Sequence, residues 1–142
     1  MDDAARARRI LQDSHTIAVL GIHDEPSRPA AYVPEYLAKV GYRVLGVNPM
    51  LVGRVICGHP VAATLAELGE PLDMIDVFRR AEAIAPHLDD LLAAKPKVVW
   101  LQLGIRNDEI ARTLERHGIE VIQDRCTLAD HQRFGLPARG AR

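Results

Sequence analysis

Residues 21–28, GIHDEPSR, have the composition of a loop that binds a nucleotide phosphate. They follow the apolar run 16–20 and precede a predicted helix, which is where an α/β sheet holds phosphates. Gly21 allows an anion to approach the backbone closely, Ser27 can donate its hydroxyl, and N–H groups entering the helix can point at a phosphate. The alternative is an ordinary strand-to-helix turn, because many such turns carry glycine and serine.

The segment Val47-Asn48-Pro49 ends the second predicted strand, where a fold that binds NAD presents an acid to a ribose. Neither this ending nor the glycine spacing of residues 21–28 matches the dinucleotide fingerprint G-x-G-x-x-G with its later acid. Asn48 can hydrogen-bond a base or a ribose without repelling a nearby phosphate, or it can be a turn residue before Pro49. The pattern predicts a nucleotide ligand other than NAD.

Five further side chains follow the ends of predicted strands. The guanidinium groups of Arg28, Arg79 and Arg80 suit phosphate oxygens, although all three can instead be solvated loop charges. Cys126 lies where the start of a helix would favour its thiolate, and the alternative is a small buried hydrophobe. His23 can be structural or solvated rather than a ligand contact.

Apolar periodicity, proline and glycine predict alternating strands and helices. Strands are expected at 16–20, 42–47, 74–78, 98–101 and 120–123, with an extended piece at 54–57. Helices are expected at 3–12, 33–40, 62–68, 80–94, from 107 or 108 to 117, and at 127–134. Pro34 is placed in the first turn of its helix, where its missing N–H costs nothing. Trp100, inside the fourth strand, is expected to pack in the core.

This alternation predicts an α/β fold: a Rossmann-like, open, parallel five-stranded sheet with helices on both faces. Right-handed crossovers favour the strand order 3-2-1-4-5. We expect a single domain over residues 1–134 and a flexible tail over residues 135–142. Ligands of such sheets lie outside the carboxyl ends of the strands, here near the switch point between the first and fourth strands.

Composition excludes several classes of protein. The 142 residues suit one domain, and 48% hydrophobic content with 26% charged residues is not that of a disordered chain. A formal net charge of -1 gives no basic excess for binding nucleic acid. We find no apolar run of about 18 residues and no secretory leader, so we expect no membrane span and a cytoplasmic location. No Cys/His spacing predicts a metal site.

Five segments in sequence order together resemble the small, stand-alone CoA-binding proteins, which are similar to the CoA-binding Rossmann domain of the succinyl-CoA synthetase α subunit. The resemblance covers residues 10–134, with a late histidine at position 131. The segments are Ser27-Arg28-Pro29, Val47-Asn48-Pro49, Asp76-Val77-Phe78-Arg79-Arg80, Val99-Trp100-Leu101-Gln102-Leu103-Gly104 and Asp124-Arg125-Cys126.

The resemblance implies coenzyme A as the ligand. It places the pyrophosphate on residues 21–28, the adenosine toward residues 47–49 and Arg79, and the pantetheine arm across residues 102–104. The expected contacts are Gly21, Ile22, His23, Ser27, Arg28, Val47, Asn48, Pro49, Phe78, Arg79, Arg80, Gln102, Gly104 and Cys126. A ligand with three phosphates also explains several arginines and the missing ribose acid better than NAD does.

We expect binding without autonomous catalysis, because the synthetases place their phosphohistidine and ATP-grasp modules in additional domains. One alternative is an enzyme, either a CoA-dependent thiol oxidoreductase or an acyl-transfer component that uses Cys126. Another is a regulatory module that senses CoA and acts through a protein partner. The choice among free CoA, an acyl-CoA and CoA disulfide stays open, as does the choice between a protein partner and a homo-oligomer.

Overall fold

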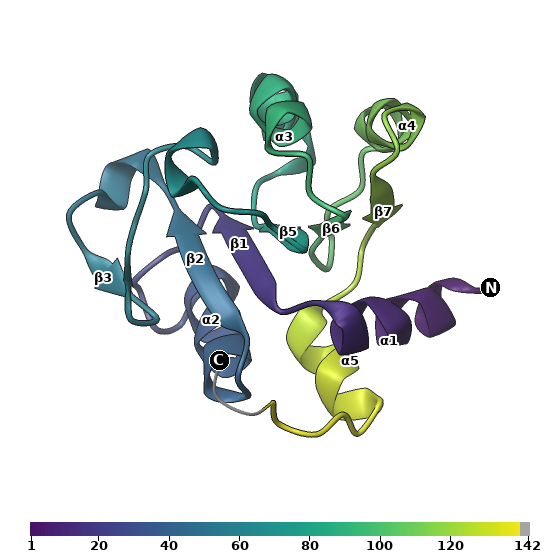
Figure 1. Ribbon diagram of the computed structural model, residues 1–142, viewed down its shortest axis with the longest axis horizontal. Helices are drawn as coiled ribbons and strands as arrows, with labels where there is room; N and C mark the ends of the chain where they lie inside the picture. The colour runs from purple at the N-terminus through teal and green to yellow at the C-terminus, as the bar shows by residue number, and fades with distance from the viewer. Residues whose placement is uncertain (140–142) are drawn as a thin grey trace.

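A parallel five-stranded sheet runs through the centre of the computed structural model, which describes residues 1–139 (Figure 1). Its strands follow one another in the order β2-β1-β5-β6-β7. A two-stranded antiparallel hairpin contacts β2. The strands of the sheet are β1 (Thr16–Leu20), β2 (Arg43–Val47), β5 (Met74–Val77), β6 (Val98–Leu101) and β7 (Glu120–Ile122), and those of the hairpin are β3 (Val55–Ile56) and β4 (His59–Pro60).

The predicted Rossmann-like class is confirmed, but the predicted strand order is wrong in one respect. The third strand of the sheet, β5, lies between β1 and β6 instead of at the edge beyond β2, with Leu20 of β1 opposite Val77. All four residues of β5 are buried, whereas the edge strand β2 begins with the exposed Arg43. Strand hydrophobicity alone cannot rank neighbours in a parallel sheet. The switch point is therefore between β1 and β5, which brings the loops that follow these two strands together.

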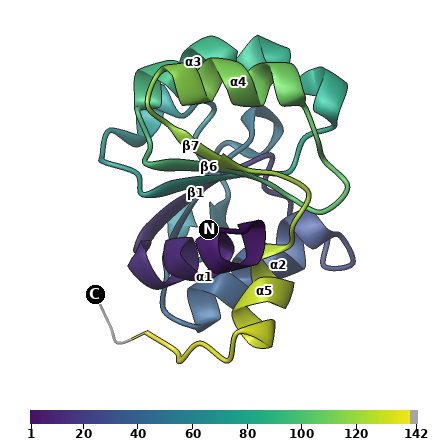
Figure 2. The same cartoon turned by 90° about the vertical axis from the view of Figure 1, so that its right-hand side faces the viewer.

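Helices cover both faces of the sheet (Figure 2). On one face lie α1 (Asp3–Asp13), α2 (Pro29–Lys39) and α5 (Thr127–Arg133), and on the other lie α3 (Leu88–Ala94) and α4 (Asp108–Arg116). Side chains alternate along each strand, so Ile17 and Val19 pack toward the first group while Ala18 and Leu20 pack toward the second. Two buried clusters thus hold the sheet from either side.

Helix α2 begins at Pro29, four residues earlier than predicted, and Pro34 lies inside it rather than in its first turn. A proline there leaves the carbonyl of Ala30, four residues before it, without a helical partner. The backbone N–H of His23 donates to that carbonyl at 3.0 Å. The proline is tolerated because the loop after β1 uses the acceptor it frees.

The helix predicted over 80–94 is interrupted, because Pro86 cannot supply the N–H that a continuous helix needs. Two 3-10 turns, Ala81–Ala83 and Ala85–His87, precede α3. The helix predicted over 62–68 is reduced to the 3-10 turn Ala66–Leu68. No helix within residues 1–139 is long and apolar enough to cross a membrane.

Trp100 and Arg139 each join segments that are distant in the sequence. Trp100 is fully buried, as predicted, and its indole N–H donates to the backbone oxygen of Arg125 at 2.7 Å. Near the C-terminus, the Arg139 guanidinium lies 4.9 Å from the centre of the Tyr42 ring and donates to the Leu11 carbonyl at 3.1 Å. Residues 135–139 thus contact α1 and the start of β2, while residues 140–142 of the predicted tail lie outside the described residues.

Candidate functional site

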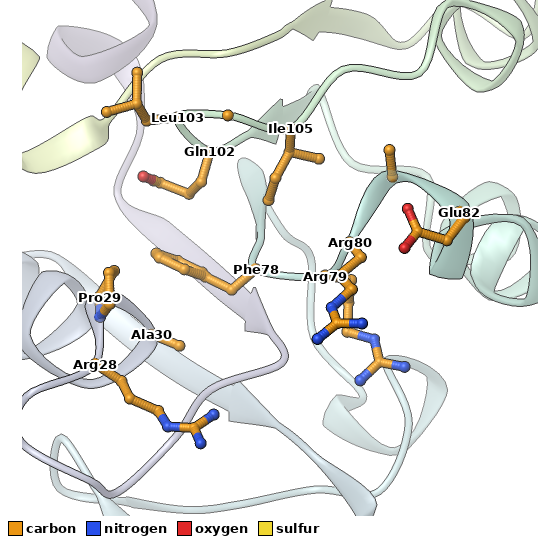
Figure 3. A pocket seen from close by; sticks show the side chains of 12 residues that line it. Arg28, Pro29, Ala30, Phe78, Arg79, Arg80, Glu82, Gln102, Leu103 and Ile105 are labelled. Atoms are coloured by element: carbon orange, nitrogen blue, oxygen red, sulfur yellow. The ribbon is translucent and has the colours of Figure 1, made fainter.

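Two cavities open at the carboxyl ends of the strands and share Arg79. The Phe78 cavity has a volume of about 620 Å³ and is shown in Figure 3. Its lining is Arg28, Pro29, Ala30, Phe78, Arg79, Arg80, Ala81, Glu82, Gln102, Leu103, Gly104 and Ile105. The Asn48 cavity has a volume of about 430 Å³. Its lining is Leu20, Gly21, Val47, Asn48, Pro49, Met50, Ala63, Thr64, Arg79, Pro86, His87 and Asp90.

Gly21 allows the loops after β1 and β5 to lie against each other. Its φ is +91°, and a Cβ there would lie 2.7 Å from the Phe78 carbonyl oxygen and 3.2 Å from Arg79 Cδ. Its N–H donates to the Val47 carbonyl at 2.9 Å, which also ties it to the end of β2. Only glycine fits this conformation and this contact without strain.

Asn48 joins the turn after β2 to the loop after β1. Its Nδ2 donates to the Ile22 carbonyl at 2.8 Å, and its Oδ1 accepts from the Met50 N–H at 2.9 Å at the start of the 3-10 turn Pro49–Leu51. The turn-residue interpretation of Asn48 therefore describes its contacts within the protein. Ile22 and Val47 are both buried; Val47 lines the Asn48 cavity, whereas Ile22 packs in the core and lines neither cavity.

The three predicted arginines gather around the two cavities. Arg28 stands at the start of α2, and Arg79 and Arg80 follow β5 (Figure 3). All three are exposed, and none of them forms an ion pair with another described residue. Burial and the neighbouring Arg79 both lower the pKa of His87 in the Asn48 cavity. Carboxylates are nearby, since Glu82 lines the Phe78 cavity, Asp90 lines the Asn48 cavity and Arg28 helps to lower the pKa of Glu25, but none of them forms an ion pair with the three arginines.

His23 and Ser27 lie in the loop after β1 but line neither of these two cavities. Ser27 Oγ donates to Glu25 Oε2 at 2.6 Å, and the Ser27 N–H donates to Glu25 Oε1. Both hydrogen bonds lower the pKa of the Glu25 carboxyl. His23 Nδ1 accepts from the Glu25 N–H at 3.0 Å. That His23 and Ser27 contact the ligand stays a prediction. The Glu25 carboxylate lies beside them.

A buried polar cluster lies beneath the Phe78 cavity, and the sequence prediction did not single out its acid. Asp76, within β5, is fully buried and accepts hydrogen bonds from Gln102 and from Thr127 of α5. Burial raises the pKa of Asp76 to about 7, with both hydrogen bonds acting in the opposite direction. An acid in the middle of the apolar run Met74–Val77 was the available signal, because charged residues are rarely buried without a partner.

Gly104 and Cys126, two further predicted contacts, differ in whether they line a cavity. Gly104, at φ +84°, lines the Phe78 cavity, and its N–H donates to Asp124 Oδ1 at 2.6 Å. Cys126 lies at the start of α5, half-buried, and packs against the apolar cluster beneath α1, α2 and α5. It lines neither cavity. Within residues 1–139, no group of three His, Cys, Asp or Glu side chains could hold a metal ion.

Comparison with solved structures supports the fold. A Thermus thermophilus protein described as cell-free ID.343 is 48% identical, with a TM-score of 0.89 over 94% of this chain and 98% of its own. A hypothetical protein from Pyrococcus horikoshii OT3 is 26% identical, with a TM-score of 0.85 over 94% and 92%. A dinucleotide-forming acetyl-coenzyme A synthetase 1 from Ca. Korarchaeum cryptofilum shares the fold at 18% identity and a TM-score of 0.68, over 81% of this chain and 27% of its own.

Sequence comparison identifies the family. The uncharacterized protein YneT of Bacillus subtilis (strain 168) is 33% identical over 127 residues, which cover 89% of this chain and 93% of that protein. Residues 15–132, which include every strand and the loops that line both cavities, match the CoA binding domain family. The chain therefore belongs to the CoA-binding domain family, as its five segments had indicated.

Proposed function

We propose that the protein binds coenzyme A across the two cavities at the carboxyl edge of the sheet. The 3′-phosphoadenosine end occupies the Asn48 cavity, and the pantetheine arm extends along the Phe78 cavity. The observation that carries this proposal is, in a chain of the CoA-binding family, a group of three arginines without ion-pair partners among residues 1–139; all three line the Phe78 cavity, and Arg79 also lines the Asn48 cavity. Guanidinium groups left free in this way suit the phosphates of the ligand.

Charge also indicates where the pyrophosphate lies. The side chain of Glu25 places a carboxylate at the outer part of the loop after β1, where Ser27 holds it. Because like charges repel, the Glu25 carboxylate disfavours a phosphate over the outer end of the loop. Gly21 and Arg79 lie in contact at the inner end. We infer that the pyrophosphate lies on this inner side, facing Arg28 and Arg79, and that Ser27 serves the loop itself.

The Phe78 cavity suits the amphipathic pantetheine arm. Phe78, Leu103 and Ile105 supply apolar surface, and Leu103 is 69% exposed. The buried Gln102 supplies a polar group among them. Small-molecule sites commonly combine apolar walls with a few fixed polar groups.

We infer that binding, without catalysis by the protein alone, is the function. Cys126 packs against the apolar core outside both cavities, which supports the simple binder over a thiol oxidoreductase or an acyl-transfer component. Cys57 and Cys126 are both free thiols, as proteins of the reducing cytoplasm usually have. Free CoA, an acyl-CoA and CoA disulfide share the phosphates that the arginines would contact.

Calorimetry with CoA, acetyl-CoA and NAD tests the proposal, together with mass spectrometry of whatever co-purifies with the native protein. We expect both CoA ligands to bind and NAD to bind more weakly. NAD binding as tightly as CoA would overturn the proposal. Incubation with CoA disulfide followed by intact mass measurement tests the alternative, since an adduct on Cys126 but not on Cys57 would favour thiol exchange.

A further inference from the structure

Asp76, Gln102 and Thr127 form a closed hydrogen-bonded ring under the Phe78 cavity. Gln102 Nε2 donates to Asp76 Oδ1 at 2.7 Å and to Oδ2 at 2.9 Å, and it lies 2.8 Å from Thr127 Oγ1. Thr127 Oγ1 donates to Asp76 Oδ2 at 3.1 Å. The three residues are at most 4% exposed. They come from β5, from the end of β6 and from the first turn of α5, so the ring joins three elements.

The chemistry of the ring fixes the orientation of the Gln102 amide. The hydroxyl of Thr127 has one proton, and when that proton goes to Asp76 the Thr127 oxygen is left to accept from Gln102 Nε2. Rotating the amide by half a turn would set Gln102 Oε1 against a carboxylate, which has only acceptors when ionised. Ionised Asp76 therefore holds the nitrogen of Gln102 inward.

The oxygen of Gln102 consequently faces the cavity. Within residues 1–139 nothing donates a hydrogen bond to Oε1, yet no buried side-chain polar atom among them lacks a partner. Oε1 must then be accessible, and Gln102 lines the Phe78 cavity. Figure 3 shows this oxygen at the end of the side chain that is visible from the cavity.

We propose that Asp76 is a positioning residue which, through Gln102, makes the Phe78 cavity present a hydrogen-bond acceptor to the ligand. This inference rests on the proposed function, because the pantetheine arm carries amide N–H groups that Oε1 can accept. When Asp76 takes up a proton, its hydroxyl can donate to Oε1, and the amide then turns Nε2 toward the cavity. The Nε2 donor would then face the N–H donors of the arm, so the protein with ionised Asp76 is the form that binds the arm.

Asp76 is the group of this ring that titrates near neutral pH. Its pKa of about 7 follows from burial, and no charged residue is among the causes. Its neighbours in the sheet, Val19 and Trp100, are apolar. On α5, which contacts β5 through Thr127, Asp130 pairs with Arg125 at 2.7 Å and His131 forms a hydrogen bond with Tyr36 at 2.7 Å. In the loop after β1, His23 accepts a hydrogen bond from the Glu25 N–H.

The test compares CoA with the β-methyl ester of adenosine 3′-phosphate 5′-diphosphate, in which the terminal phosphate is esterified as in CoA, so that the ligand has the same ionisable phosphates but lacks the arm. Calorimetry from pH 8 to pH 6 gives the ratio of their two affinities. The phosphates, and His87 of the Asn48 cavity, are present with both ligands, so the ratio isolates the arm. We expect the preference for CoA to fall about three- to tenfold as the pH drops through the pKa of Asp76, the size of one neutral hydrogen bond. A constant ratio would overturn this inference and leave CoA binding intact, whereas no CoA binding at any pH would overturn the proposed function.

Two variants sharpen the test. Gln102→Met keeps the length of the side chain but removes the acceptor, so at pH 8 it should bind CoA about three- to tenfold more weakly and the arm-less ligand unchanged. Asp76→Asn should make the affinity ratio independent of pH. Gln123→Met, at a glutamine that lines neither cavity, is the control and should behave as the wild type. Unchanged CoA affinity in Gln102→Met contradicts the inference, and if that variant does not fold, the wild-type pH profile decides.

Discussion

Two groups of arginines, one at the amino edge of the sheet and one around the Phe78 cavity, differ in their partners. At the amino edge, Arg43 pairs with Glu70 at 2.9 Å, and Arg6 and Arg9 pair with Glu120 at the start of β7 at 3.0 and 2.6 Å. At the carboxyl edge, Arg28, Arg79 and Arg80 pair with no carboxylate of the described residues. Arg106 and Arg125, which follow β6 and β7 at the same carboxyl edge, do form ion pairs, with Asp108 and Asp130. The contrast is therefore between arginines that pair within the fold and the three that line the Phe78 cavity without a carboxylate partner.

Two acids of one segment show the same contrast. Asp73, just before β5, accepts from the Thr16 and His15 N–H groups and pairs with Lys97 at 3.2 Å. Burial acts against its ionisation, but these partners prevail and lower the pKa of Asp73. For Asp76, three residues along, burial prevails and raises the pKa. The fold thus favours the ionised form of Asp73 at the amino edge and disfavours the ionised form of Asp76 beneath the cavity.

The largest expected effect comes from exchanging these two acids for asparagine. Asp76 binds its proton more tightly in the folded protein than in the unfolded chain, so its contribution to stability declines as the pH rises from about 4 to its folded pKa of about 7. Asp76→Asn should be more stable than the wild type by about 1.6 kcal/mol at pH 5 and by up to about 4 kcal/mol at pH 8. Asp73→Asn should lose about 1–3 kcal/mol at pH 8, because a carboxylate favoured when folded is lost. Urea unfolding at both pH values measures each change, and a destabilised Asp76→Asn at pH 8 would contradict the contrast.

Gly21→Ala should have the next largest effect. The new Cβ meets the Phe78 carbonyl at 2.7 Å with the backbone at a positive φ, so we expect a loss of about 2–4 kcal/mol and at least tenfold weaker CoA binding. Gly53→Ala is the matched control, since its φ is also positive, at +96°, and nothing lies within 4 Å of the added Cβ. It should lose about 1 kcal/mol and bind CoA normally. Equal losses in both variants would mean that the approach of the two loops contributes nothing.

Arg79→Ala tests the arginines of the Phe78 cavity directly. Because Arg79 lines both cavities and has no carboxylate partner among the described residues, we expect CoA affinity to fall by about 1–2 kcal/mol with little change in stability. The loss should be smaller with dephospho-CoA if Arg79 contacts the 3′-phosphate. Calorimetry with both ligands measures the difference, and equal losses would place Arg79 away from that phosphate.

Arg43→Ala should show the smallest effect. Its ion pair with Glu70 is partly exposed, so the free energy of unfolding should fall by less than about 1 kcal/mol, and CoA affinity should stay unchanged. Thermal unfolding and calorimetry on the same sample give both values. Weakened CoA binding here would show that the division between the two groups of arginines does not hold.

The sequence predicted the helices and strands better than it predicted which strands lie next to each other in the sheet. The predicted helix from 107 or 108 to 117 matches α4, with Asn107 accepting the Ile110 N–H at its start, because capping is a local interaction. Strand order was wrong because the position of β5 depends on packing between distant segments. Two of the three helix errors arose at Pro34 and Pro86: the first proline is tolerated through the His23 N–H, and the second breaks its helix.

Residue type alone indicated the arginines of the candidate site, whose contacts with a ligand stay predictions. Arg28, Arg79 and Arg80 do lie at the two cavities, since any loop after a parallel strand ends at the same edge. The role of Asp76 depends on Gln102 and Thr127, which are 26 and 51 residues away, so no local pattern reveals it. Cys126 was placed correctly after β7, but sequence does not show which way its side chain packs.

The bond between the Trp100 indole and the Arg125 carbonyl gives the molecule an optical reporter of its own. Trp100 is the single tryptophan of the chain, buried two residues before Gln102, and its N–H partner lies in the loop that leads into α5. A displacement of that loop changes the polarity around the indole, and with it the wavelength of the emission. Ligand arrival at this edge can thus be timed by stopped-flow fluorescence without any label.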